Sequence, residues 1–225
     1  MSLRVPLFVS VAIVAGMLAA SVMALFLLPP HTAIPIHWGI EGRPDRFATG
    51  FYAVFVAPAV AALVASVFVA IPVIEPRRLH LESSAKFYRT SWIALMLFLA
   101  VVHGLALYAA GHPGSPMGSV IAGGVSLLLV VTGNYLGKTR SMFFAGLRTP
   151  WTLASEYSWQ HTHALAGKLF IAAGVVSFVA AITLPMPEAM RLLIFTVAGA
   201  AALSIAASYV FWRRDPARNT TEPNT

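Results

Sequence analysis

Long apolar stretches separated by short polar segments dominate this chain. A helix of roughly 20 apolar residues crosses the bilayer core, which is about 30 Å thick. None of the stretches alternates apolar and polar residues with a period of two, so we expect helices and no β-barrel. The six stretches that qualify are residues 5–28, 51–74, 91–110, 118–136, 165–184 and 192–212. The pattern predicts an all-α integral membrane protein, a six-transmembrane-helix bundle that forms a single membrane domain over residues 1–225.

The first apolar stretch is predicted to be a retained helix and not a cleaved signal peptide. It is much longer than the apolar region of a signal peptide, which has about 7–15 residues. It ends in Leu27-Leu28-Pro29-Pro30 rather than in a small-residue cleavage site.

The composition excludes a soluble domain. Hydrophobic residues make up 58 % of the chain and charged residues 10 %, against about 45–50 % and about 25 % in soluble domains. A chain without Cys has no disulfide scaffold and no Cys-ligated zinc site. His161 and His163 are two residues apart, which is a poor spacing for metal ligands on a helix. We therefore expect no cofactor and no bound metal.

Lys and Arg residues are distributed unequally between the two sets of connecting segments. Arg43, Arg46 and Arg191 fall on one predicted side, and eleven Lys and Arg residues fall on the other. Because cytoplasmic loops carry the excess of Lys and Arg, both termini are predicted to be cytoplasmic. We attribute the net charge of +7 to these segments rather than to direct nucleic-acid binding. Residues 213–225 are predicted to form a disordered cytoplasmic tail.

The loop over residues 30–50 is predicted to be a small folded cap on the extracytoplasmic side. Its sequence, PHTAIPIHWGIEGRPDRFATG, contains Pro and Gly residues that favour turns over a helix. His37 and Trp38 are adjacent, and Asp45 lies between two Arg residues. Trp38 and Phe47 are either interfacial anchors, as Trp often is, or apolar contacts for a ligand.

A second unusual loop, residues 138–164, is predicted on the cytoplasmic side. Thr149 is placed to cap a helix that has Pro150 at its first position. We expect that helix to run on toward the fifth span.

Three residues of this loop would share one face of such a helix, namely Glu156, Trp159 and His163. Arg148 lies just before the helix begins. Charged groups near lipid are costly unless they are paired, so we expect pairing among Arg148, Glu156 and His163. The cluster is then a salt-bridged brace, a ligand or partner site, or a metal site.

Polar residues within the spans are few. His103 is the one ionisable residue deep in a span, and Asn134 lies near the cytoplasmic end of the fourth. Ionisable residues inside a membrane are functional candidates, although a single His is also typical of hydrogen-bonded packing. Small residues at Ala200, Ser204 and Ser208 have the spacing that allows close helix packing.

Dividing the chain after the third span gives two halves of three spans. Each half has a long loop containing Pro and Trp after its first helix. An odd number of spans inverts the second half relative to the first, which is the pattern of inverted repeats in transporters. A 3+3 inverted repeat, and with it a secondary transporter or efflux protein for a small molecule or peptide, is therefore the alternative interpretation.

Two runs of this sequence resemble a known family. GNYLGKTRSMFFAGLRTPWTLASEYSWQHTHALAGKLF (residues 133–170) is similar to the SdpI family of bacterial membrane proteins, which is named for a peptide-toxin immunity protein. IPIHWGIEGRPDRF (residues 34–47) resembles a domain of unknown function that usually precedes it. Two positions depart from the family pattern. Gly137 stands where Pro is common, and Ala164 stands where a basic residue is common.

The resemblance implies a set of site residues for binding a ligand or partner. The outer motif comprises His37, Trp38, Gly42, Pro44 and Asp45. The inner motif comprises Asn134, Tyr135, Arg148, Thr149, Pro150, Trp151, Glu156, Trp159 and His163.

The resemblance also implies a function. We expect a non-enzymatic protein of the bacterial cytoplasmic membrane that gives immunity to a membrane-active peptide toxin or senses it. Its implied partners, besides the lipid bilayer, are an amphipathic peptide outside and a cytoplasmic repressor inside. Acid–base catalysis by Glu156 and His163 is geometrically conceivable, but the chain lacks a nucleophile elbow, an H-E-x-x-H motif and a phosphate loop. We therefore expect no catalytic residues.

Overall fold

The computed structural model of this protein describes residues 1–112 and 114–219. In that part, six helices are long and apolar enough to cross a membrane, so the predicted six-helix membrane fold is confirmed. The elements are α1 (Arg4–Leu27), β1 (Ile34–Trp38), β2 (Pro44–Ala48), α2 (Gly50–Ile74), α3 (Arg78–Ser83), α4 (Ala85–Gly111), α5 (Met117–Leu136), α6 (Pro150–Ala154), α7 (Glu156–Thr183), α8 (Met186–Arg213) and α9 (Pro216–Asn219).

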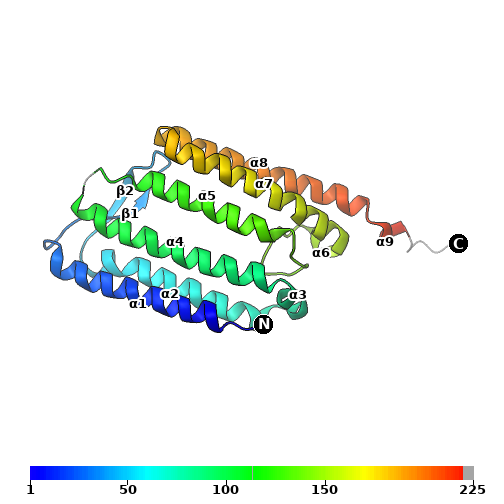
Figure 1. Ribbon diagram of the computed structural model, residues 1–225, viewed down its shortest axis with the longest axis horizontal. Coiled ribbons are helices and arrows are strands. Elements are labelled where there is room, and N and C mark those ends of the chain that lie inside the picture. The colour runs from blue at the N-terminus through cyan, green and yellow to red at the C-terminus, as the bar shows by residue number, and fades with distance from the viewer. Residues whose placement is uncertain (113, 220–225) are drawn as a thin grey trace.

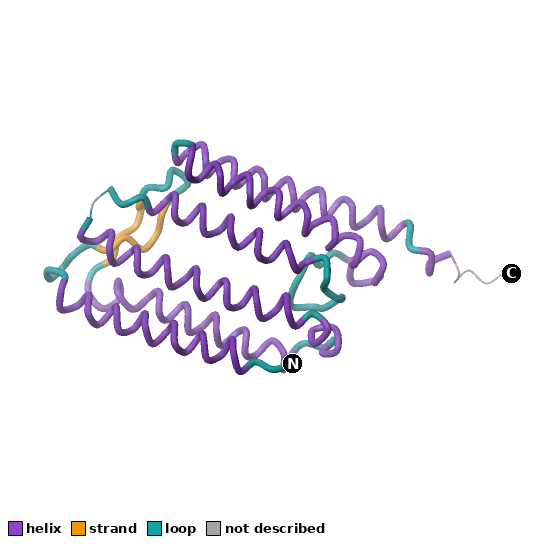
Figure 2. Tube along the Cα trace, viewed as in Figure 1, coloured by secondary structure: helices purple, strands orange, loops and turns teal. Residues whose placement is uncertain are grey.

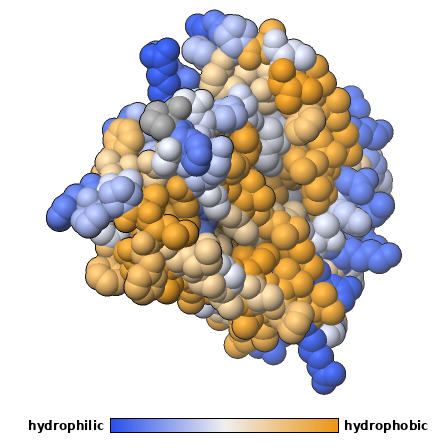
Figure 3. All heavy atoms as spheres, turned by 60° about the vertical axis from the view of Figure 1, so that its left-hand side comes forward, coloured by the Kyte–Doolittle hydropathy of each residue, from blue (hydrophilic) through white to orange (hydrophobic). Residues whose placement is uncertain are grey.

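Exposed apolar side chains cover the sides of the bundle. Phe8 of α1 is 74 % exposed, and Phe195 of α8 is 72 % exposed. Figure 3 shows apolar residues over much of the face that it presents. An apolar surface of this extent would associate in water, whereas lipid solvates it. The chain is therefore a multi-pass membrane protein.

The six spans form two units of three helices. One unit contains α1, α2 and α4, and the other contains α5, α7 and α8 (Figure 1). The helices of the two units meet along α4 and α5. The division into two halves of three spans agrees with the sequence, and inverted-repeat symmetry between the halves stays a prediction.

Small residues bring α5 and α7 into close contact. A Cβ added to Gly167 would lie 2.6 Å from the carbonyl oxygen of Gly133, and one added to Gly174 would lie 2.6 Å from that of Ser126. Side chains at these positions would overlap the facing backbone. On α8, the predicted small-residue stripe is buried as expected: Ala200, Ser204 and Ser208 are at most 5 % exposed.

His103 joins two helices of the first unit. Its Nε2 lies 3.1 Å from Ser21 Oγ and 3.2 Å from the Met17 carbonyl oxygen, both on α1. Ser21 Oγ in turn donates to the Val54 carbonyl of α2 at 2.6 Å. The Ser21 hydroxyl proton is thus committed to Val54, so His103 Nε2–H donates toward α1. These contacts favour the interpretation of His103 as a hydrogen-bonded packing residue.

The two unusual loops lie at opposite ends of the bundle. Figure 2 shows the β1–β2 hairpin at one end and the loop before α6 at the other. We call these the hairpin end and the RTPW end, after Arg148–Trp151, and residues 138–164 the RTPW segment. Arg43 and Arg46 of the hairpin and Arg191 near the start of α8 lie at the hairpin end. The larger set of Lys and Arg lies at the RTPW end, near helix ends and in the segments between helices. Which end faces the cytoplasm stays a prediction.

Four expectations about helix boundaries are wrong. The third span, α4, begins at Ala85 instead of residue 91. The helix that begins at Pro150 does not run into the fifth span, because Ser155 is extended (φ −143°, ψ 119°) and its hydroxyl caps a new helix by accepting from Ser158 N–H. That span, α7, begins at Glu156 instead of residue 165. The sixth, α8, begins at Met186 instead of residue 192.

The predicted disordered tail is wrong over residues 213–219. Arg213 ends α8, and α9 follows within these residues. Asp215 accepts a hydrogen bond from Ser155 Oγ at 2.5 Å, which fastens the chain after α8 to the junction of α6 and α7. The rest of the predicted tail, residues 220–225, lies outside the described residues.

Candidate functional site

The predicted folded cap at residues 30–50 is a β-hairpin. Strands β1 and β2 are antiparallel, with Ile34 opposite Ala48 and Trp38 opposite Pro44. Pro has no N–H to donate and is tolerated at a strand edge, which fits Pro44 at the first position of β2. The register is irregular on both sides of His37.

His37 and Asp45 form a polar pair on this hairpin. His37 Nδ1 donates to Asp45 Oδ1 at 2.6 Å, and the two side chains are 54 % and 49 % exposed. The hydrogen bond from His37 holds the pKa of Asp45 below its ordinary value. Two outer-motif residues, His37 and Asp45, are therefore brought together on an accessible surface.

The His37–Asp45 pair predicts a pH dependence. A carboxyl group whose folded-state pKa is lowered stabilises the folded form above its unfolded pKa, and this contribution is lost as the pH falls through the folded pKa. We expect an NMR titration of the Asp45 carboxyl carbon to show a midpoint below that of an unpaired Asp, and His37→Gln to raise this midpoint. An unchanged Asp45 midpoint in His37→Gln would contradict the pairing.

Gly42 is required where the hairpin turn touches the second helix unit. It has a φ of +70°, which favours Gly, and an added Cβ would overlap the side chain of Met186. A Cβ on Gly118, at the start of α5, would lie 2.7 Å from the Gly42 Cα. The hairpin connects α1 and α2 of the first unit, and its turn packs against α5 and α8 of the second unit.

At the RTPW end, His163 is a buried hydrogen-bonding residue. Its Nε2 accepts from the Leu147 N–H at 2.9 Å, and its Nδ1 donates to the Trp159 carbonyl oxygen at 2.8 Å. The ring stacks on that of Trp159 at 3.9 Å between centroids, and the Trp159 indole N–H donates to the Thr139 carbonyl oxygen at 3.1 Å. Both nitrogens of the imidazole are engaged, so it holds the loop and has no nitrogen left to transfer a proton.

The position of His163 requires Gly146. This residue has a φ of +98°, and an added Cβ would lie 2.6 Å from His163 Nε2 and 3.0 Å from Trp159. Gly146 therefore combines a backbone conformation and a close approach that other residues do not allow.

The RTPW motif fastens α6 to α8. Thr149 and Thr152 form a capping box at the start of α6, with Pro150 at the first position as predicted. The Thr149 hydroxyl lies 3.1 Å from Ser208 Oγ of α8. The Trp151 ring packs edge-on against Tyr209, 5.2 Å between centroids.

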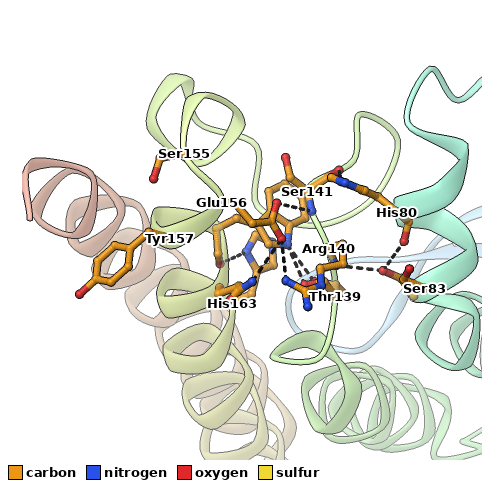
Figure 4. Close-up of polar contacts among 12 residues, drawn as sticks. His80, Ser83, Thr139, Arg140, Ser141, Ser155, Glu156, Tyr157 and His163 are labelled. Atoms are coloured by element: carbon orange, nitrogen blue, oxygen red, sulfur yellow. Dashed lines mark hydrogen bonds and ion pairs between the residues drawn. The ribbon is translucent and has the colours of Figure 1, made fainter. Parts of the chain in front are cut away.

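The predicted pairing of Arg148 with Glu156 is wrong. Arg148 Nη1 donates to the Phe143 carbonyl oxygen at 2.7 Å. Glu156 pairs instead with Arg140, whose Nη1 lies 3.4 Å from Glu156 Oε1, and the two side chains face one another in Figure 4. The reason is the break at Ser155, which sets α6 apart from α7 and so separates Arg148 from the Glu156 helix. Arg148→Ala should accordingly leave Glu156 paired.

Glu75 is a site residue that the sequence analysis missed. It follows the end of α2, is 1 % exposed, and its carboxylate accepts from the N–H groups of Arg77, Phe143 and Phe144 at 3.0–3.2 Å. A signal was present, because an acidic residue next to the end of an apolar span is costly unless it is paired.

Two basic residues beside Glu75, also missed, complete the attachment of the RTPW segment. Arg77 donates to Ser141 Oγ, and to the Leu153 carbonyl oxygen at 3.1 Å. His80 Nδ1 donates to the Ser141 carbonyl oxygen at 2.7 Å. The segment between α2 and α4 of the first unit thus holds the RTPW segment, which precedes α7 of the second unit.

Asn134 and Tyr135 do not join this network. Asn134 is exposed on α5, and Tyr135 lies under Lys138, whose Nζ is 5.7 Å from the ring centroid. The outer and inner motifs lie at opposite ends of the bundle (Figure 2), so they do not form one site.

The buried position of His163 predicts a stability effect. His163→Leu leaves the Leu147 N–H without its acceptor, and an unsatisfied buried donor costs about 1–3 kcal/mol. We expect a lower midpoint of thermal unfolding in detergent. The control is His161→Leu on the same helix, because His161 is exposed. Equal midpoints for the two variants would contradict the role assigned to His163.

Comparison with known proteins agrees with the two motifs. The SdpI/YfhL protein family matches residues 138–208, and a domain of unknown function (DUF1648) matches residues 12–62. The immunity protein SdpI of Bacillus subtilis (strain 168) is 24 % identical over 207 residues, which are 92 % of this chain and 95 % of that protein. No solved structure matches the chain.

Each matched region covers part of one helix unit, and α4 and α5 lie outside both regions. The DUF1648 region covers most of α1, the hairpin and the first half of α2, and the SdpI/YfhL region covers the RTPW segment, α7 and most of α8. The resemblance found in the sequence is confirmed: this chain is a multi-pass membrane protein with an SdpI/YfhL family region preceded by a DUF1648 region.

Proposed function

We propose that this protein protects a bacterium against a membrane-active peptide, from a position in the cytoplasmic membrane with both termini inside. The observation that carries the proposal is the similarity to an immunity protein over nearly the full length of both chains. The site geometry supports a role without catalysis, because His163, the residue suited to acid–base chemistry, uses both ring nitrogens to hold the RTPW segment.

In this proposal the hairpin is the surface that meets the peptide. The exposed His37–Asp45 pair shares the hairpin with two apolar side chains, Ile40 at 57 % and Phe47 at 55 % exposure. An amphipathic peptide could pack its apolar side on Ile40 and Phe47 while a cationic group meets Asp45. The turn at Gly42 would transmit a displacement to α5 and α8, because it packs against both.

We further propose that the RTPW segment presents a surface to a cytoplasmic partner such as a repressor. Phe143 and Phe144 are 39 % and 41 % exposed although Glu75 and Arg148 bind their backbone groups. Exposed aromatic side chains on a fixed backbone suit a protein contact.

Survival under peptide challenge tests the function. We expect expression of the chain in a toxin-sensitive bacterium to raise survival, and Ile40→Ser with Phe47→Ser to remove that gain. The matched control is Phe8→Ser with Phe195→Ser, which changes two exposed apolar residues on the sides of the bundle; all variants are compared at equal membrane abundance. No gain in survival with any candidate peptide, or equal loss in both double variants, would contradict the proposal.

Transport is a second candidate function, favoured by the two three-helix units. A groove of about 540 Å³, lined almost entirely by apolar residues of α4, α5 and α7, lies beside the contact between the units. Uptake of labelled peptide by proteoliposomes, with and without a pH gradient, separates the two functions. Immunity by binding predicts no gradient-dependent uptake.

A further inference from the structure

A polar pocket at the RTPW end opens beside the hydrogen-bond network of the inner motif. It has a volume of about 390 Å³ and lies between the end of α5 and the second turn of α7. Its polar lining residues are Lys138, Thr139, Arg140, Gln160 and His161. Figure 4 shows Arg140 on the strand of chain that faces α7.

The pocket carries a surplus of positive charge. The ammonium group of Lys138 lies over the Tyr135 ring at 5.7 Å. Arg140 meets Glu156 at 3.4 Å, which is long for a charged pair, and Gln160 Nε2 lies at the same distance from that carboxylate. The pocket lining therefore has two cationic side chains, Lys138 and Arg140, of which only Arg140 is paired with a carboxylate.

The pocket lies beside the end of a membrane-spanning helix, where the polar headgroup region of a bilayer begins. Gly137, which directly follows the last residue of the membrane-spanning α5, forms part of its wall. Ala164 and Lys168 lie three and seven residues after His161 on α7, so the three residues share one helix face. Lys168 therefore lies about one turn deeper than the pocket. A Lys at that depth is costly unless an anion is near or its side chain extends to the interface.

We propose that this pocket binds a phosphate group, supplied by the headgroup of an anionic phospholipid. Basic pockets at the cytoplasmic ends of transmembrane helices are suited to such headgroups. Lys138 and Arg140 contact the phosphate, Gln160 donates an amide hydrogen bond, and the acyl chains lie along the apolar surface of α5. This site is separate from the peptide contact proposed for the hairpin.

The experiment uses the delipidated full-length protein in detergent and the rise in thermal midpoint on adding phosphatidylglycerol. We expect Lys138→Gln with Arg140→Gln to weaken the response roughly 25-fold in lipid concentration, from about fivefold for each basic side chain near an anionic lipid. Lys138→Gln alone, which leaves the Arg140–Glu156 pair intact, should weaken it about fivefold. The single variant keeps the test valid if the double variant folds poorly.

Three controls identify the ligand. Lys86→Gln with Arg213→Gln removes the same charge at the same end of the bundle, outside the pocket, and should respond as the wild type does. Phosphatidylcholine should give a weaker response than phosphatidylglycerol. A response to inorganic phosphate that the pocket variants lose would assign the site to a free phosphate instead of a headgroup. An equal response to phosphatidylglycerol in the wild type and both pocket variants would overturn the proposal.

Discussion

Replacing Glu75 by Ala should destabilise this protein more than any other single change at the RTPW end. The Glu75 carboxylate is buried and accepts from three backbone N–H groups, two of them in the RTPW segment. Hydrogen bonds to a charged group contribute about 1.5–3 kcal/mol, and buried donors left unsatisfied cost about 1–3 kcal/mol each. We expect a loss of at least about 3 kcal/mol in the free energy of unfolding, which corresponds to about 1 kcal/mol for each of the three unsatisfied donors.

Thermal unfolding in detergent measures the effect of Glu75→Ala. A loss of about 3 kcal/mol corresponds to roughly 6–12 °C for a chain of this length. Glu82→Ala is the matched control, because Glu82 is an acidic residue that also lies between α2 and α4 but has a 54 % exposed side chain. Exposed ion pairs contribute about 0–1 kcal/mol. If the two variants unfold at the same temperature, Glu75 does not hold the RTPW segment in place.

The second large effect is expected for Gly167→Ala in the contact between α5 and α7. The added Cβ would lie 2.6 Å from the Gly133 carbonyl oxygen, and backbone atoms of two packed helices cannot move aside without separating the helices. Overpacking of this kind costs about 1–3 kcal/mol and occasionally more. We expect lower membrane accumulation and a lower thermal midpoint.

A helical glycine in open space provides the control for Gly167→Ala. Gly104 of α4 has no atom within 4 Å of an added Cβ, so Gly104→Ala should leave the midpoint unchanged or raise it slightly, because Ala favours helices. Gly133→Ala should resemble Gly167→Ala, since its Cβ would lie 2.9 Å from the Gly167 carbonyl oxygen. Similar midpoints for Gly167→Ala and Gly104→Ala would contradict the close contact.

The spans could be predicted from the sequence because a helix that crosses lipid needs a long run of apolar residues, and such runs are visible in the sequence. Their boundaries were less predictable where polar residues extend a helix beyond the apolar run. Residues 156–164 were predicted to be helical, but as a continuation of the helix that begins at Pro150. The break at Ser155 depends on its partners, because its hydroxyl accepts from Ser158 N–H and donates to Asp215. Local polarity does not reveal such tertiary partners.

The candidate sites were predictable as segments but not as contacts. His37 and Asp45 are eight residues apart, so their pairing depends only on the hairpin. The partner of Glu156 depends on the path of the whole loop, and spacing along the chain indicated Arg148 where the fold provides Arg140. Glu75 is 68 residues from Phe143, a separation that no local pattern addresses.

The account requires the hairpin and the RTPW segment to lie on opposite sides of one membrane. Because the chain contains no Cys, a single engineered Cys is the one thiol of the chain that can be labelled. Glu41 and Lys86 are exposed positions at the two ends. We predict that a membrane-impermeant maleimide labels Glu41→Cys in intact cells and labels Lys86→Cys only after the cells are permeabilised. Labelling of both variants in intact cells, or of neither, would contradict the arrangement.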